Sequence, residues 1–188
     1  MIKKNKYKII IIFCVILITL KVLSITIRIP DDNYKIEDFI TIVNKFSGAH
    51  SEIKIVLTQP YYTPTFNGGG SFNVQYPLNL TLVGEPSNGT VYDCGHSVLN
   101  HIHFTFLTQN KYDKMNFTIE NIKFYDYFDP YLSGTTSLFF IHPLTPYLTV
   151  NFKNCTFESS NINLFRYNID NYMKNDNYQF SFDYCKFM

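Results

Sequence analysis

The sequence predicts an all-β protein, a short parallel β-helix in which successive coils of the chain stack on one another. One apolar pattern, with steps of three and then two residues, occurs three times. Its copies are Ile119, Ile122 and Phe124; Phe152, Cys155 and Phe157; and Phe182, Cys185 and Phe187. The middle positions lie 33 and then 30 residues apart (155 − 122 and 185 − 155), and such a near-fixed period is typical of solenoids. The chain also has 15 Tyr, 18 Phe and no Trp, and aromatic and β-branched residues favour strands.

A β-sandwich is the alternative all-β fold for this chain. In a sandwich each strand occupies a different environment, so matching positions would not need to repeat. In a parallel β-helix matching positions stack at about 4.8 Å, and the repeat forms inward columns of side chains. The step of three breaks strict alternation and predicts a bulge or bend at Asn121, at residues 153–154 and at residues 183–184. The repeat therefore favours the β-helix.

The first thirty residues predict export. Residues 1–8 are basic and residues 9–20 form an apolar run, which is shorter than the roughly 20 residues that a bilayer-spanning helix needs. We expect a signal peptide over residues 1–24, cleaved after Ser24. The alternative is an uncleaved anchor from Ile9 to about Ile29, which would be the only membrane contact of the chain. In both cases the domain, residues 31–188, is secreted or lies on the extracellular or lumenal side of a membrane.

A single helix is predicted over residues 34–46. Asp31 and Asp32 are expected to cap its N-terminus, and Gly48 is expected to end it. The residues of its apolar face are Ile36, Phe39, Ile40, Val43 and Phe46.

Further segments have the alternation or apolar content of strands. They are residues 52–57, 78–84, 90–93, 101–107, 136–141 and 161–167. Polar, turn-rich segments join them, among them residues 59–70, which contain Pro60, Pro64 and three consecutive glycines. Little helix pattern lies between the strands, and this order argues against a doubly wound α/β fold.

The order of these segments resembles the start of right-handed parallel β-helix proteins of the pectin lyase-like superfamily. After the helix, the segments that carry the resemblance are IKIVLTQPYYT, LNLTLVGE, NGTVYDCG, NFTIENIKF and LTVNFKNCTF. The NCTF-type strands are most similar to non-enzymatic surface proteins with repeats of the polymorphic outer-membrane-protein type. The resemblance implies that the helix caps the N-terminal end of the solenoid. Such proteins typically have many more coils, so a truncated fragment of a larger surface protein is one expectation.

Charge and glycosylation signals agree with export. Five lysines lie in the first 24 residues, and the remainder has 11 basic and 15 acidic side chains, a net charge of −4. No basic patch remains for nucleic acid, so we expect no nucleic-acid partner. Four N-x-Thr motifs predict N-glycosylation at Asn79, Asn88, Asn116 and Asn154, although a chain rich in Asn and Thr produces some such motifs by chance.

Carboxylates for catalysis are scattered along the sequence. Glycan-cleaving enzymes need converging carboxylates, often with an Arg or Lys. The candidates are Asp93, Asp126, Asp129, Asp170 and Asp183. Arg28 and Arg166 are the only guanidinium groups, and the paired-Asp and Arg-x-Lys motifs of polygalacturonases are absent, although residues 94–97 faintly resemble their Gly-His-Gly segment. We therefore predict no catalytic residues.

A zinc site is one interpretation of Cys94, His96, His101 and His103, because clustered Cys and His side chains bind zinc. His101 and His103 would share one face of a strand. Their spacing matches no zinc finger and the expected compartment is oxidising, so we predict surface or packed histidines, no metal ligands and no cofactor.

Removal of a signal peptide leaves three cysteines, Cys94, Cys155 and Cys185. Cys155 and Cys185 occupy one predicted column, where a strand spacing of about 4.8 Å permits a disulfide. Two buried thiols are the equal alternative, because adjacent parallel strands give the bond an awkward geometry.

We expect a non-enzymatic secreted or cell-surface protein that acts in adhesion or glycan binding. Its partners would be glycans or cell-surface proteins, and aromatic loop residues would stack on sugars. The aromatic candidates are Tyr61, Tyr62, Tyr125, Tyr127, Phe128 and Tyr131. A polysaccharide lyase- or hydrolase-like enzyme, or a degenerate relative of one, is the alternative.

Overall fold

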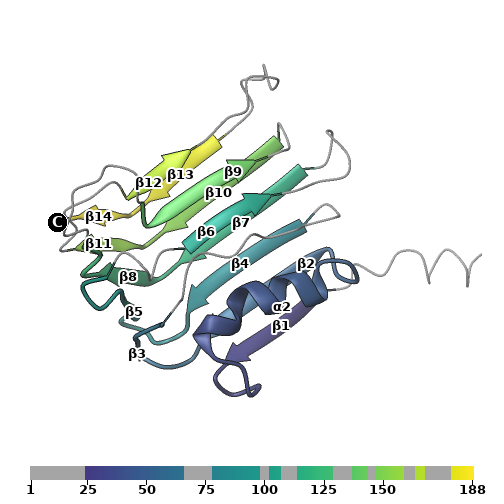
Figure 1. Cartoon of the computed structure of the whole chain (residues 1–188), viewed down its shortest axis with the longest axis horizontal. Helices are drawn as coiled ribbons and strands as arrows, with labels where there is room; N and C mark the ends of the chain where they lie inside the picture. Colours follow the sequence, from purple (N-terminus) through teal and green to yellow (C-terminus); the bar gives the residue numbers. More distant parts are fainter. Residues whose placement is uncertain are drawn as a thin grey trace, which may run out of the picture.

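The described residues of the computed structural model are 24–65, 78–97, 102–106, 114–128, 137–143, 147–158, 164–167 and 179–188. They form a parallel β-solenoid of three sheets with one short helical segment (Figure 1). Every strand pair among these residues is parallel. The prediction of stacked parallel coils is therefore confirmed.

Sheet A has six strands in the order β1-β2-β4-β7-β10-β13. These strands are β1 (Ser24–Ile29), β2 (Glu52–Leu57), β4 (Leu78–Gly84), β7 (Lys114–Glu120), β10 (Tyr147–Lys153) and β13 (Gln179–Asp183). Each strand is one coil further along the chain, so residues about one period apart lie side by side.

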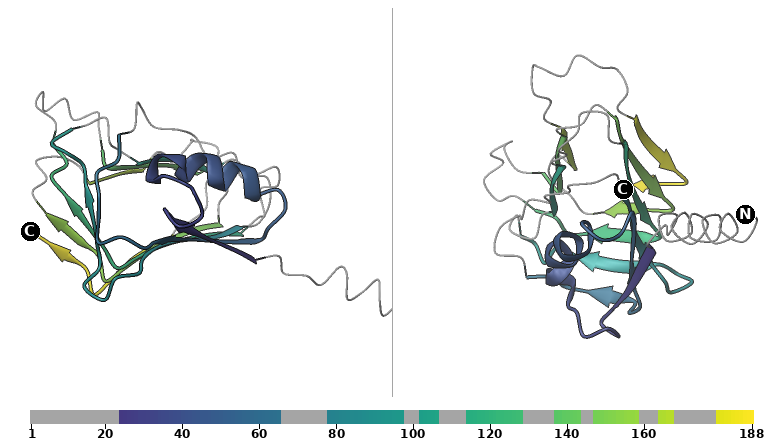
Figure 2. Two further views of the ribbon diagram at one scale, coloured as in Figure 1. Left: turned by 90° about the horizontal axis from the view of Figure 1, so that it is seen from below. Right: turned by 90° about the vertical axis from the view of Figure 1, so that its right-hand side faces the viewer.

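Two smaller sheets form the other sides of the coil. The strands of sheet B are β3 (Tyr61–Tyr62), β5 (Thr90–Asp93), β8 (Ile122–Tyr125), β11 (Thr156–Glu158) and β14 (Lys186–Phe187). The strands of sheet C are β6 (Ile102–Phe106), β9 (Phe139–Pro143) and β12 (Phe165–Tyr167). Figure 2 shows the coil in cross-section, with the helix α2 lying across it from sheet A.

The strand β1 contains residues that precede the predicted domain start. Its sequence SITIRI alternates, and the inward Ile27 and Ile29 are 5% and 0% exposed. β1 pairs with β2 from Ser24 opposite Glu52 onward, so the solenoid includes residues seven positions before Asp31 (31 − 24). This short strand was missed because it directly follows the apolar segment and reads as part of it.

The predicted signal segment, residues 1–23, lies outside the described residues. Within the part of the chain that the structure describes, no helix is long and apolar enough to cross a membrane. Export and signal cleavage stay predictions.

The predicted helix is present but starts later than expected. It consists of a 3₁₀ turn, η1 (Ile36–Asp38), followed by α2 (Phe39–Phe46). Asp31 and Asp32 do not cap it. The cap is at Lys35, whose backbone N–H donates to Asp38 Oδ2 at 2.7 Å, whereas Asp32 Oδ2 accepts a hydrogen bond from the backbone N–H of Arg28 at 2.7 Å. The buried face that packs on the core is formed by Ile36, Phe39, Ile42 and Val43.

The strand register confirms two of the inward columns, Ile119/Phe152/Phe182 and Phe124/Phe157/Phe187. In the third, Ile122/Cys155/Cys185, Ile122 and Cys155 are buried at 1% and 0% exposure. The Phe157 ring stacks on Phe124 at 5.4 Å and 10°, and on Phe187 at 5.0 Å and 14°. Phe152 stacks on Phe182 at 5.2 Å and 5°. These separations are close to the strand spacing of about 4.8 Å, so the aromatic columns follow directly from coil stacking.

The step of three in the repeat is a corner between sheets A and B, as predicted. Asn121, Asn154 and Tyr184 occupy this corner in successive coils with left-handed φ values of 59°, 49° and 57°. Asn121 Nδ2 donates to the backbone oxygen of Gly84 at 2.7 Å, and Asn154 Nδ2 donates to Asn121 Oδ1 at 3.0 Å. Asparagine tolerates this backbone conformation better than most residues, because its short polar side chain forms local hydrogen bonds.

Tyr184→Asn is expected to raise the free energy of unfolding by about 1 kcal/mol, because asparagine relieves the left-handed strain at this corner. For a chain of this size that gain corresponds to a Tm increase of roughly 2–4 °C, which a circular dichroism melt can measure. Tyr184→Leu is the control, since it removes the exposed ring without supplying the amide. An equal gain from leucine would show that the corner conformation is not the cause.

Candidate functional site

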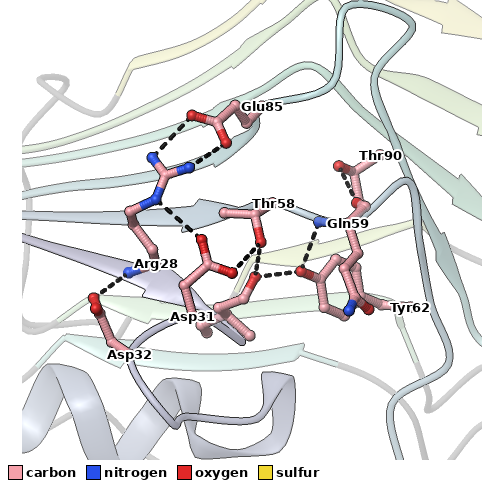
Figure 3. Close-up of polar contacts among 9 residues, drawn as sticks. Arg28, Asp31, Asp32, Thr58, Gln59, Tyr62, Glu85 and Thr90 are labelled. Atoms are coloured by element: carbon pink, nitrogen blue, oxygen red, sulfur yellow. Dashed lines mark hydrogen bonds and ion pairs between the residues drawn. The ribbon is translucent and has the colours of Figure 1, made fainter.

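The first polar surface cluster surrounds Arg28 (Figure 3). Arg28 Nη1 donates to Glu85 Oε1 at 2.9 Å, Nη2 binds the other oxygen of the same carboxylate, and Nε donates to Asp31 Oδ2 at 3.2 Å. Thr58 Oγ1 donates to Asp31 Oδ1 at 3.1 Å. The hydrogen bond from Arg28 lowers the pKa of the Glu85 carboxyl below its ordinary value. The cluster ties β1 to the turn after β4, and we assign it a structural role.

The second polar cluster covers the outer surface of sheet B, and we call it the aromatic–carboxylate face. Along β5, β8 and β11 the inward residues Tyr92, Phe124 and Phe157 are 1–2% exposed, so the alternate residues lie outward. The members of the face are Tyr61, Asp93, His96, Lys123, Tyr125, Asp126, Phe128 and Glu158. Most of them come from the ends of three neighbouring strands.

The end of sheet B aligns three of these residues in one row. Asp93, Tyr125 and Glu158 are the last residues of β5, β8 and β11 and are register partners. Lys123 lies two residues before Tyr125, and its Nζ is 2.6 Å from Glu158 Oε2 and 5.3 Å from the centroid of the Tyr125 ring. The ammonium group of Lys123 is therefore engaged by residues of this row.

Tyr61 is the most exposed tyrosine or phenylalanine ring of the face. Its exposed fraction is 51%, and its hydroxyl donates to Asp93 Oδ2. The backbone N–H of Gly95 donates to Asp93 Oδ1 at 2.8 Å. Both carboxylate oxygens of Asp93 therefore accept a hydrogen bond. The bond from the Tyr61 hydroxyl fixes the orientation of the Tyr61 ring at the surface of the sheet.

A second aromatic surface follows the ends of β5 and β8. His96 stacks on Phe128 with a centroid distance of 3.9 Å and an interplanar angle of 15°. His96 Nδ1 lies 2.9 Å from Asp126 Oδ1. His96 and Asp126 both have left-handed φ values, 55° and 57°. The two residues form a stacked corner of successive coils, in which the backbone N–H of His96 donates to the backbone oxygen of Asp126 at 3.0 Å.

The structure brings together several predicted residues that are distant in sequence: Tyr61, Asp93, His96, Tyr125, Asp126 and Phe128. Two aromatic predictions are wrong. Tyr62 and Tyr127 are 8% and 1% exposed and belong to the core, Tyr62 because it is the inward register partner of Tyr92.

Other candidates lie elsewhere or outside the described residues. Asp183 ends β13 in sheet A, and only the backbone of His103 is described, within β6. Outside the described residues lie Asp129, Asp170, Tyr131 and His101. Among the residues that are described, no group of three or more His, Cys, Asp or Glu side chains could hold a metal ion.

Lys123 and Glu158 belong to the face but were not predicted as site residues. The repeated apolar pattern could have identified both residues as outward-facing. Each lies next to an inward aromatic of the repeat, Phe124 or Phe157, and alternation in a strand directs such neighbours outward.

The three described cysteines are thiols in this structure. Cys155 Sγ lies 3.5 Å from the backbone oxygen of Ile119, and Cys185 Sγ lies 3.4 Å from that of Phe152. Each of these two thiols therefore donates to the preceding coil. The Cys155–Cys185 disulfide stays a prediction.

We expect Cys185 to be alkylated at least about tenfold faster than Cys94 or Cys155 in the folded, reduced protein at pH 8. Burial raises the pKa of Cys155 to about 12 and raises that of Cys94 well above its ordinary value, whereas Cys185 is only partly buried. The thiolate is the reactive species, so these shifts suppress reaction. Timed iodoacetamide labelling with peptide mass spectrometry measures the rates. Equal rates at all three sites would contradict this account, and protection of Cys185 before reduction would reveal the disulfide.

The four predicted glycosylation sites are all exposed. Asn79 and Asn116 are register partners on the outer surface of sheet A, where Asn116 Nδ2 donates to Asn79 Oδ1 at 2.8 Å. Asn88 lies in the turn after β4, and Asn154 is the corner residue described above. On sheet A the N-x-Thr motif also follows from the period of two, which places polar residues outward. Glycosylation stays a prediction.

Fold and surface together define a class of protein: a parallel β-solenoid with a partly exposed row of aromatic and carboxylate side chains along one sheet. No protein-family model, curated protein or solved structure matches this chain. The likeness to the pectin lyase-like superfamily therefore rests on the order of the segments, and the function must be inferred from the surface.

Proposed function

We propose that this chain is a non-enzymatic, exported or cell-surface β-solenoid that binds glycans through the aromatic–carboxylate face. The observation that carries the proposal is Tyr61, whose half-exposed ring is fixed by Asp93. Sugars present apolar C–H faces beside hydroxyl groups, and they fit a surface on which aromatic rings alternate with hydrogen-bond acceptors. A ring that is already held in place loses little side-chain entropy on binding.

The charge of the face favours a glycan over a nucleic acid. Asp93, Asp126 and Glu158 contribute three carboxylates, against the ammonium group of Lys123 and that of Lys186, which lies outward on β14 of the same sheet. Phosphate backbones are bound by Lys and Arg, and carboxylates repel them. Hydroxyl groups of sugars can donate to carboxylate oxygens, so the same charges suit a polyhydroxyl ligand.

Tyr61→Ala is expected to weaken glycan binding by at least about tenfold, because it removes a half-exposed ring and the partner of Asp93. A glycan array with the secreted full chain would identify the ligand, and titration calorimetry would give the affinities. Tyr184→Ala is the matched control, since Tyr184 is 91% exposed but is not part of the face. Equal losses in both variants, or no binding to any glycan, would contradict the proposal.

A glycan-cleaving enzyme is the second candidate, and the His96–Asp126 pair favours it. A histidine oriented by a carboxylate is a common general base. Analysis of the bound glycan after prolonged incubation discriminates between the two functions. We expect to recover the intact glycan. Cleavage of the glycan by the parent protein but not by the His96→Gln variant would show that the protein is an enzyme and not only a binding protein.

A further inference from the structure

The turn after β4 presents an Asn-Gly pair to solvent. Asn88 is exposed, and the backbone N–H of Gly89 donates to the backbone oxygen of Pro86 at 2.8 Å, which closes the turn. Gly89 has a left-handed φ of 82°. Among the asparagines that the structure describes, only Asn88 is followed by glycine. Asparagine is one of the thermolabile residues of proteins.

The absence of a side chain at Gly89 favours reaction of Asn88 with its own backbone. In this reaction the backbone nitrogen of the following residue approaches the side-chain carbonyl carbon, Cγ, and a side chain on that residue crowds the approach. Asn79, Asn116 and Asn121 precede leucine, phenylalanine and isoleucine, so the approach is crowded at each of them. Its exposure also gives Asn88 access to the water on which the second step depends.

From these observations we propose that Asn88, where it carries no glycan, is a site of spontaneous conversion to aspartate and isoaspartate. The backbone nitrogen of Gly89 attacks Asn88 Cγ, a new C–N bond forms, and the bond from Cγ to Nδ2 breaks. Nδ2 leaves as ammonia with the proton of the Gly89 N–H, and a five-membered succinimide ring remains. Water then opens the ring at one of its two carbonyl carbons. Opening at Cγ gives aspartate, and opening at the backbone carbonyl gives isoaspartate, in which the chain continues through Cγ.

Isoaspartate would disturb the corner that this turn contacts. A Cβ built on Gly89 would lie 3.1 Å from the backbone oxygen of Asn121 and 3.2 Å from its Oδ1, so the turn lies directly against this residue. Asn121 Nδ2 donates to the backbone oxygen of Pro86 at 3.0 Å, and the backbone N–H of Thr90 donates to the backbone oxygen of Asn121 at 3.1 Å. Isoaspartate adds one methylene group to the backbone between these two hydrogen bonds, so they cannot both keep their geometry.

A glycan and the succinimide compete for the same side-chain nitrogen. In the N-x-Thr motif of Asn88 the threonine, Thr90, is 0% exposed, and its Oγ1 donates to the backbone oxygen of Gln59 at 3.0 Å. A glycosyltransferase needs access to the whole motif, so a glycan has to be attached before the chain folds. A chain that folds without the glycan keeps Asn88 open to the reaction. The glycan as the alternative rests on the proposed export, whereas the reaction of unmodified Asn88 does not.

Ageing of the full chain, made without glycans in a bacterial host, tests the proposal. Samples are incubated at pH 8, and peptide mass spectrometry with electron-transfer fragmentation, which distinguishes the two products, follows each asparagine. We expect Asn88 to convert at least about tenfold faster than any other described asparagine, with both products present. A second Asn-Gly pair, at 67–68, lies outside the described residues, and cleavage after Glu85 places it on a different peptide. An equal rate at Asn79 or Asn116, or aspartate without isoaspartate, would overturn the proposal.

Two variants separate the backbone change from the charge. Asn88→Gln keeps the amide, but its longer side chain would have to form a six-membered ring, so we expect no isoaspartate at this position and no Tm loss from it. Asn88→Asp supplies the charge of the products with a normal backbone. We expect its fresh Tm to stay within about 1 °C of the fresh parent, while the aged parent loses roughly 2–4 °C relative to aged Asn88→Gln. An aged parent as stable as aged Asn88→Gln, or a fresh Asn88→Asp protein with the full loss, would contradict the effect assigned to isoaspartate at this corner.

Discussion

Phe152→Ala is expected to lower the free energy of unfolding by about 3–5 kcal/mol, the usual cost of removing a buried phenylalanine ring. Phe152 is 0% exposed and lies at the centre of the aromatic core. Its ring stacks on Phe182 and meets Phe139 and Phe165 edge-on at centroid distances of 5.2 and 5.1 Å. Urea denaturation followed by circular dichroism measures the change.

The control for Phe152 is its partner in the same column. Phe182 has the same inward position one coil later but is 40% exposed, so Phe182→Ala removes less buried surface. We expect a cost below about 2 kcal/mol for this variant. Equal costs for the two variants would mean that the column does not stack as described, or that the last coil is fully covered in solution.

Gly84→Ala is expected to cost about 3 kcal/mol or more, because there is no room for a Cβ atom at the end of β4. A Cβ at Gly84 would overlap the backbone oxygen of Asn121 and would lie 2.8 Å from Thr90 Oγ1. Asn121 is the corner residue whose side-chain amide donates to Gly84, so it cannot move away without loss of that bond. Overpacking a rigid backbone contact of this kind destabilises strongly.

Gly48→Ala is the matched control for Gly84, since nothing lies within 4 Å of a Cβ at that position. We expect a change within about 0.5 kcal/mol. Thermal melts of both variants are sufficient for the comparison. A Gly84→Ala protein as stable as the parent would show that β4 and the corner at Asn121 do not approach each other closely.

Much of the fold could be predicted from the sequence because the coil repeats. Strands β2, β4 and β5 have the predicted bounds, since alternation ends there at clear turn residues. The corner at Asn121 was predicted from the step of three alone. β1 was missed because its alternation is hidden beside a longer apolar run, and the helix start was misplaced because Asp32 bonds to Arg28 instead.

The candidate site was harder to predict, because its residues come together only through the register of the coils. Asp93, Tyr125 and Glu158 are 32 and 33 residues apart (125 − 93 and 158 − 125) and become neighbours in one row. The repeat period and the alternation around Phe124 and Phe157 would have aligned them, but the corners of the backbone decide which residues after the strands, such as His96 and Phe128, join the row. Tyr62 and Tyr127 were misplaced for the same reason, since composition does not distinguish a core tyrosine from an exposed one.

Nuclear Overhauser contacts between backbone and ring protons test the stacking of parallel coils most directly. We expect Phe152 to show contacts to both Ile119 and Phe182, its register partners one coil before and one coil after. We also expect no close Hα–Hα pairs between β7 and β10, because antiparallel but not parallel strands bring those protons together. Strong Hα–Hα contacts between these strands, or contacts from Phe152 to only one of its two partners, would contradict the solenoid and indicate a β-sandwich.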